Sequence, residues 1–110
     1  MNGQESQMIT RLWRGWTTRE KADAYERLLR DEILPGIAAR LPEGYRGARM
    51  FRRDIEDGVE FLTVLTFESE DAIRSFVGDD VEVANLPEKA RALLARFETR
   101  AQHYREVPLG

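Results

Sequence analysis

The side chains that can do chemistry lie on the first and the last predicted strands of this chain. His103 is the only histidine, and its imidazole, with an ordinary pKa of about 6.5, can take a proton from a bound phenol. Arg11 and Trp13 alternate along the first strand, so both point to one face, where a guanidinium can hold an anion beside an aromatic ring. The structural alternatives are a hydrogen-bonded histidine at a subunit interface and a tryptophan that only packs in a core or at an interface.

A second set of side chains predicts the walls of a pocket. Arg49 and Phe51 alternate on one predicted strand, and we expect them to share a cavity with Thr63 and Leu65 of the next strand. A charged residue that keeps the edge of a sheet soluble explains Arg49 equally well. His103 has no cysteine and no regularly spaced carboxylate to join it, so we expect no metal ion. The expected substrate-binding residues are Trp13, Arg49, Phe51, Phe61, Thr63 and Leu65.

Composition and charge limit the class of protein. The 110 residues suffice for one domain, and they carry a formal net charge of -3. Because non-specific affinity for nucleic acid comes from a concentrated basic face, we expect no nucleic-acid partner. No apolar run approaches the roughly 20 residues that cross a bilayer, and neither a secretory signal pattern nor a cysteine occurs. We therefore expect a cytoplasmic protein that does not contact a membrane.

The predicted elements that hold these side chains follow the order β-α-β-β-α-α-β. This order predicts an α+β, ferredoxin-like split βαβ fold, in which a four-stranded antiparallel sheet carries helices on one face. Residues 1–7 are polar and lack periodicity, so we expect a flexible tail before a single domain over residues 8–110. Strand-like alternation occurs over residues 8–16, 45–53, 59–67 and 99–107, and helical spacing of apolar residues over 17–41, 69–78 and from 85 onward.

Start and stop signals give the expected helix ends. Thr17 and Asn85 each precede a glutamate by three residues, which predicts capping boxes, and Ser69 precedes an acidic first turn. Pro35 lacks a backbone donor and clashes with the preceding turn, so the first helix should kink or end near Leu34 and can resume beyond it.

The sheet face without helices is expected to bind a second copy of the chain. Part of the set Trp13, Phe61 and His103 is expected on this face, where it would form an apolar patch larger than soluble monomers normally expose. Two copies packed sheet to sheet would bury the patch, so the sequence predicts a homodimer.

Four stretches of the sequence together form a recognisable pattern: M-I-T-R-L-W-R-G-W-T at 8–17, F-L-T-V-L-T-F-E-S-E-D-A-I at 61–73, L-P-E at 86–88 and H-Y-R-E-V at 103–107. With the order of the predicted elements, they resemble the antibiotic biosynthesis monooxygenase-like proteins of the dimeric α/β-barrel superfamily. The resemblance implies a homodimer whose sheets enclose a cavity, which in some members hosts cofactor-independent oxygenation of phenolic or quinol substrates and in others binds or degrades haem.

Haem degradation is not expected, because the residues of that branch are absent. It uses an asparagine on the first strand, a tryptophan at the end of the third strand and a histidine near the second helix. Here Phe67 stands near the tryptophan position, the asparagines are Asn2 and Asn85, and the histidine is on the last strand. We therefore expect no cofactor, with haem binding as the weaker alternative.

Three functional hypotheses follow, and the first two involve a small aromatic ligand. In a cofactor-independent monooxygenase, His103 would be the base or the orienting residue, Arg11 the anion stabiliser and Trp13 the stacking wall. In a ligand-binding or sensing dimer, the same pocket would hold a metabolite without chemistry. In a purely structural dimer, the aromatic residues would form the interface and leave no sizeable cavity.

Overall fold

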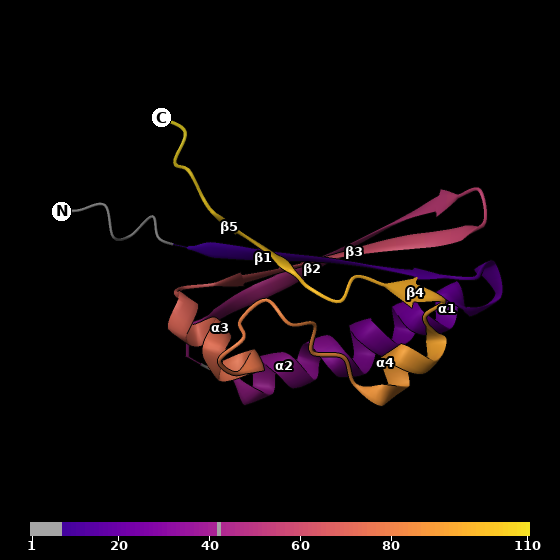
Figure 1. Cartoon of the computed structure of the whole chain (residues 1–110), viewed down its shortest axis with the longest axis horizontal. Coiled ribbons are helices and arrows are strands. Elements are labelled where there is room, and N and C mark those ends of the chain that lie inside the picture. Colours follow the sequence, from indigo (N-terminus) through magenta and orange to yellow (C-terminus); the bar gives the residue numbers. More distant parts are fainter. Residues whose placement is uncertain (1–7, 42) are drawn as a thin grey trace.

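An antiparallel sheet and a layer of helices make up the molecule, and the helices all lie against one face of the sheet (Figure 1). The computed structural model describes residues 8–41 and 43–110, so the predicted tail lies outside the described residues. In chain order the elements are β1 (Ile9–Thr17), α1 (Arg19–Leu28), the π-helical turn η2 (Leu29–Ile33), α2 (Leu34–Arg40), β2 (Tyr45–Ile55), β3 (Gly58–Phe67), α3 (Glu70–Val77), α4 (Glu88–Leu93), β4 (Arg96–Phe97) and β5 (Gln102–Arg105).

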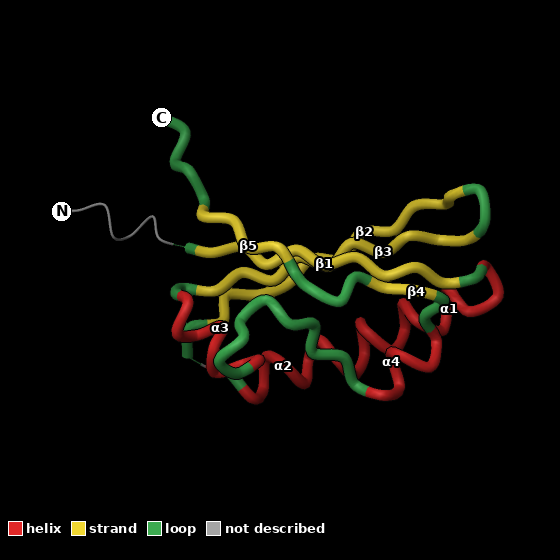
Figure 2. Tube along the Cα trace, viewed as in Figure 1, coloured by secondary structure: helices red, strands yellow, loops and turns green. Residues whose placement is uncertain are grey.

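The strand order confirms the ferredoxin-like prediction. The strands run β2-β3-β1-β4, and β5 pairs with β1 beyond β4, so β4 and β5 together occupy the place of the fourth strand (Figure 2). All of these pairs are antiparallel. The two central strands are β3 and β1, which also carry most of the predicted site residues.

The last strand is divided, which the alternation from 99 to 107 did not predict. Glu98 N–H still donates to Arg14 O at 3.0 Å, and beyond it the chain leaves β1 and pairs with the connector between α3 and α4. Ala84 N–H donates to Thr99 O at 3.0 Å, and Ala101 N–H donates to Glu82 O at 2.7 Å. Backbone groups that face the connector cannot also pair with β1, so regular strand pairing resumes only at Gln102.

The long helical segment confirms the effect predicted for Pro35. The segment changes to a π-helical turn over Leu29–Ile33 and resumes as α2 with Pro35 in its first turn. Because a proline lacks an N–H and crowds the preceding turn, the wider turn accommodates it without ending the segment. Among the described residues, no helix is long and apolar enough to cross a membrane.

Of the three predicted helix caps, one is confirmed. The Ser69 hydroxyl accepts a hydrogen bond from Ala72 N–H at 3.1 Å. Thr17 is wrong as a cap, because it is still paired in the sheet and the helix begins after Thr18. Asn85 is also wrong, because α4 begins after Pro87 and the Asn85 amide donates to the Phe76 carbonyl instead.

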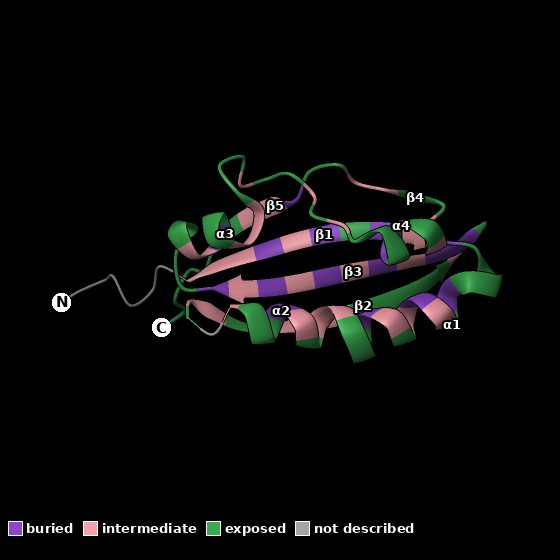
Figure 3. Ribbon diagram, turned by 90° about the horizontal axis from the view of Figure 1, so that it is seen from below, coloured by how far each residue is buried: buried purple, intermediate pink, exposed green. Residues whose placement is uncertain are grey.

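Burial alternates along β3 and shows which sheet face the helices cover (Figure 3). The prediction that part of the set Trp13, Phe61 and His103 lies on the uncovered face is wrong. Strand register puts all three on the covered face, since Trp13 pairs with Thr63 and His103 pairs with Arg11. By the same register, the uncovered face carries apolar side chains at Leu12, Trp16, Phe51, Leu62, Val64 and Tyr104.

Candidate ligand-binding site

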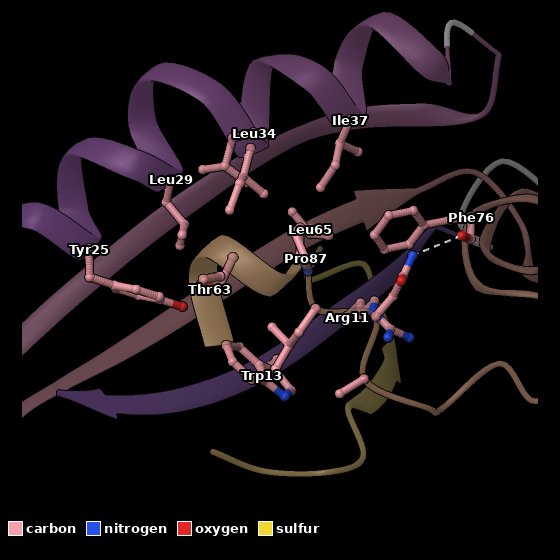
Figure 4. A pocket seen from close by; sticks show the side chains of 15 residues that line it. Arg11, Trp13, Tyr25, Leu29, Leu34, Ile37, Thr63, Leu65, Phe76 and Pro87 are labelled. Carbon is pink, nitrogen blue, oxygen red and sulfur yellow. Dashed lines mark hydrogen bonds between the residues drawn. The ribbon is translucent and has the colours of Figure 1, made fainter. Parts of the chain in front are cut away.

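A cavity of about 70 Å³ lies between the covered face of the sheet and the helices (Figure 4). Its walls are almost entirely apolar, and polar side chains reach it at only a few points. The strands contribute Arg11, Trp13, Thr63 and Leu65; the long helical segment contributes Tyr25, Leu29, Ile33, Leu34 and Ile37; and the remaining wall is Phe76, Ala84, Asn85, Leu86, Pro87 and Ala90.

A wider surface hollow of about 680 Å³ adjoins the cavity. The two share a wall made by η2, α2, α3 and the segment before α4. Glu32 and Lys89 stand at this hollow on opposite sides and form an ion pair at 3.1 Å. The shared wall residues are Ile33, Ile37, Phe76, Asn85, Leu86 and Pro87.

Arg11 is the cation of the cavity, and its side chain is almost fully buried, with 4% exposure. Its Nη1 donates to Val81 O at 2.6 Å, and its Nη2 donates to Val83 O at 2.7 Å. Among residues 8–41 and 43–110, no carboxylate lies within ion-pair distance of the guanidinium. Burial lowers the pKa of Arg11 to about 10, against the opposing attraction of Glu82. A buried charge is normally paired, so this guanidinium has capacity for an anion.

His103 supports Arg11 from outside the cavity. Its Nε2 lies 2.8 Å from Arg11 Nη1. Because a guanidinium can only donate, Nε2 must accept and the neutral ring carries its proton on Nδ1. Burial, and then the charge of Arg11, lower the pKa of His103, while Glu82 and Glu70 oppose the shift. His103 is not among the residues that line the cavity.

Trp13, Thr63 and Leu65 meet at the cavity as predicted. The Trp13 indole N–H donates to Glu98 O at 2.6 Å, which fixes the ring at the wall of the cavity. Thr63 Oγ1 is buried and has no hydrogen-bond partner in the described part of the chain. Phe61 does not line the cavity, because it lies behind Tyr25 with the two ring centroids 4.8 Å apart.

Arg49 and Phe51 lie on the opposite side of the sheet, so the prediction that they share the cavity is wrong. A β-bulge at the start of β2 shifts the register, after which Met50 pairs with Thr63 and stands on the covered face. The guanidinium of Arg49 lies 4.9 Å from the Phe51 ring centroid, and Phe51 is 44% exposed.

Sequence reasoning missed the helical walls of the cavity. Helical spacing places Tyr25 on the apolar side of the first predicted helix, and a tyrosine there brings a hydroxyl into the core, which is a usable signal. Phe76 and Pro87 carry no comparable signal, because only the tertiary fold brings α3 and the start of α4 to the same cavity. In the described residues, no group of three or more His, Asp and Glu side chains is placed to hold a metal ion.

Comparisons with solved structures find this fold in several oxygenases. SnoaB, a cofactor-independent oxygenase from Streptomyces nogalater, is 16% identical with a TM-score of 0.58, over 94% of this chain and 95% of its own. A monooxygenase from the gene ActVA-Orf6 of Streptomyces coelicolor, solved with the ligand nanaomycin D, is 19% identical with a TM-score of 0.57, over 99% and 93%. A dimeric ferredoxin-like protein from an uncultured marine organism is 14% identical with a TM-score of 0.66, over 97% and 93%.

These similarities confirm, at the level of the fold, the resemblance to antibiotic biosynthesis monooxygenase-like proteins. No protein-family model and no curated protein matches the sequence. Identities this low establish the fold alone, and a shared fold does not fix an activity. The function has to be argued from the cavity.

Proposed function

We propose that the chain is a cofactor-independent monooxygenase that acts on a small phenol- or quinol-type substrate in the cavity between sheet and helices. The observation that carries the proposal is Arg11, a buried guanidinium without a carboxylate partner in the described residues, on the wall of an apolar cavity. A phenolate oxygen would supply the missing negative charge. The fold shared with SnoaB, itself described as a cofactor-independent oxygenase, supports the same class of reaction.

Arg11 would act by lowering the pKa of the bound phenol. In a desolvated site a guanidinium stabilises the phenolate far more than it would in water, and the electron-rich anion is the form that reacts with oxygen. One oxygen atom enters the substrate and the other leaves as water. Because no bound reductant takes part, all four electrons come from the substrate, as when a ring CH₂ of its keto form becomes C=O.

His103 is proposed as the residue that orients Arg11. Its Nε2 already accepts from Arg11, so a role as general base requires that this contact first open. Trp13 is proposed as the wall on which the substrate ring lies, since its indole is fixed by the Glu98 carbonyl. With His103 and Trp13 in these roles, the proposed oxygenation takes place at the end of the cavity that Arg11 occupies.

A homodimer is part of the proposal. The uncovered sheet face presents Phe51, Leu62 and Val64 without a covering helix, and apolar patches of this kind usually mark an interface. A similar chain of known structure is described as a dimeric ferredoxin-like protein. Packing sheet to sheet would leave the cavity intact, because the cavity lies on the other face.

The second candidate is a dimer that binds or senses a small ligand without turning it over. The observation that favours it is that His103 lies outside the cavity walls with Nε2 already engaged. We do not propose haem as the ligand, because the asparagine, tryptophan and histidine of the haem-degrading branch are absent from the matching positions of this sequence.

Oxygen uptake with a panel of phenols and quinols tests the proposal. Arg11→Gln should lose uptake, whereas Arg52→Gln should keep it, because Arg52 also lies on the covered face but pairs with Asp23 and Glu26 outside the cavity. Binding without oxygen uptake would select the second candidate. Absence of binding by any panel member would contradict both.

A further inference from the structure

We propose that Glu98 is a positioning residue of the cavity, because its carboxylate frees the backbone carbonyl that holds the Trp13 indole. The inference rests on the proposed function, since it takes Trp13 as the wall on which an aromatic ligand lies. It adds a residue that does not line the cavity itself and that acts on the ligand only through the indole.

The strand register gives the pairing that Glu98 would have in a regular sheet. Strands β1 and β4 pair with Gly15 opposite Phe97. The next position along this register places Arg14 opposite Glu98. In an antiparallel ladder, a hydrogen-bonded pair exchanges two bonds, in which each residue donates its N–H to the carbonyl of the other. The first of these bonds is present, because Glu98 N–H donates to Arg14 O at 3.0 Å.

The second bond of this pair is made by the side chain of Glu98 instead of its backbone. Arg14 N–H donates to Glu98 Oε1 at 2.9 Å, while the carbonyl oxygen of Glu98 accepts from the Trp13 indole at 2.6 Å. The Arg14 guanidinium holds the same carboxylate, with Nη2 and Nε at 3.0 and 3.2 Å from Oε2. The carboxylate therefore satisfies the Arg14 N–H, which in a regular ladder would use the carbonyl, and leaves the carbonyl to the indole.

The division of the last strand makes this exchange possible. Leu12 pairs with Gln102 on β5, so residues 99–101 stand opposite Trp13 alone and pair with the connector instead. The Glu98 carbonyl lies where pairing with β1 stops. The carboxylate adds the contacts that tie this point of the chain to β1.

The Glu98 carbonyl gives the Trp13 ring its only directional contact. An indole has a single hydrogen-bond donor, and here that donor is engaged by this carbonyl. The other contacts of the ring are packing contacts, such as the one with Phe97, whose ring centroid is 6.2 Å away. Because a buried donor that loses its partner costs free energy, a displaced carbonyl would draw the indole with it or leave it unpaired. Either change alters the wall that a ligand meets.

The indole N–H signals in proton–nitrogen NMR spectra of the ligand-free protein test this role. The chain has two tryptophans, and Trp13→Phe identifies the signal of Trp13. Glu98→Ala should shift this signal upfield and speed its exchange with solvent, because Arg14 N–H and the indole then compete for one carbonyl. Glu98→Asp should act in the same direction, since the shorter side chain no longer reaches Arg14 N–H, and it carries the test if Glu98→Ala does not fold. Glu98→Gln should keep the signal in place, because its side-chain oxygen can still accept from Arg14.

Phenol titrations of the same variants separate positioning from a purely structural role. Glu98→Ala should weaken phenol binding roughly two- to tenfold, which is the effect of one hydrogen bond, whereas Glu98→Gln should retain the affinity. Glu60→Ala is the matched control, because Glu60 also accepts two hydrogen bonds from the arginine opposite it, Arg53, but does not line the cavity. It should change neither the Trp13 signal nor the affinity for phenol.

The possible results distinguish this inference from the proposed function. An unmoved Trp13 signal in Glu98→Ala, or a shifted signal with unchanged phenol affinity, overturns the inference alone. A signal that moves as far in Glu98→Gln or in Glu60→Ala also overturns it, because the effect then does not come from the contact with Arg14 N–H. If the unmodified protein does not bind phenol, the proposed function fails, and the positioning role fails with it even where the signal moves.

Discussion

Protonation of His103 should weaken the folded protein, because the contact with Arg11 requires a neutral imidazole. Nε2 lies 2.8 Å from Arg11 Nη1 and can only accept there. A proton on Nε2 would remove this hydrogen bond, because the imidazolium and the guanidinium would then both be donors and both be positively charged. Burial and Arg11 together lower the pKa of His103 in the folded state, with Glu82 and Glu70 opposing.

The size and sign of the effect follow from proton linkage. Since the unfolded chain has the higher pKa, it binds the proton first as the pH falls. The contribution of His103 to stability is therefore complete above about pH 6.5 and is lost as the pH falls through the lower folded-state pKa. One proton changes the free energy of unfolding by at most about 1.4 kcal/mol per pH unit within that window.

Urea unfolding between about pH 7.5 and about pH 5.5 measures this slope. The matched variant is His103→Gln, whose side-chain oxygen can accept from Arg11 but does not titrate. Carboxylates contribute equally to both proteins, so the difference between their slopes isolates His103. Because the chain has one histidine, its imidazole proton signals also report the pKa without assignment. Equal slopes, or an imidazole that titrates at or above about pH 6.5, would refute the Arg11–His103 geometry.

Three further predictions test the fold around the site. Ser69→Ala should lower the free energy of unfolding by about 1 kcal/mol in urea titrations, because it removes the hydroxyl that caps α3. Gly58→Ala should lower the free energy of unfolding by about 2 kcal/mol or more in the same assay, since a Cβ there would overlap the Thr17 carbonyl oxygen; a neutral result would contradict this packing. Val64→Lys should convert the proposed dimer to a monomer in light scattering while phenol binding persists, and an unchanged dimer would contradict an interface on this sheet face.

Sequence patterns predicted most strands and helices well, because alternation, prolines and helix caps act over only a few residues. Alternation along β1 and β3 separated each strand into two faces, and the observed register keeps those faces together, with Trp13 opposite Thr63. The effect of Pro35 and the cap at Ser69 also follow from short-range chemistry. The order of these elements was enough to give the ferredoxin-like arrangement.

Which face the helices cover was not predictable in the same way. Both faces of β1 and β3 carry large apolar side chains. Strand alternation therefore shows which residues share a face, but it does not show which of the two faces the helices cover. Gly15 belongs to the covered set, and Leu94 packs over it where a Cβ would lie only 2.9 Å away. That close approach depends on tertiary packing and leaves no periodic signal.

The sequence predicted only part of the candidate site, because some of its residues are brought together by register and tertiary packing. Residue type alone indicates Arg11 and His103, and antiparallel pairing of β1 with β5 sets them opposite each other. Arg49 and Phe51 were misplaced because a bulge near Gly47 changes the face on which later residues of β2 stand. The contribution of Tyr25 depends on how the helix packs on the sheet, which residue spacing along one element does not contain.

The most direct test of the central claim is a pH titration of 4-nitrophenol bound to the protein, because its phenolate is coloured and its phenol form is not. If Arg11 holds the ionised oxygen of an aromatic ligand in the cavity, the pKa of bound 4-nitrophenol should fall below its value in water. The shift should vanish in Arg11→Gln and persist in Arg52→Gln. A pKa that rises on binding, or a shift that survives the loss of Arg11, would contradict the account.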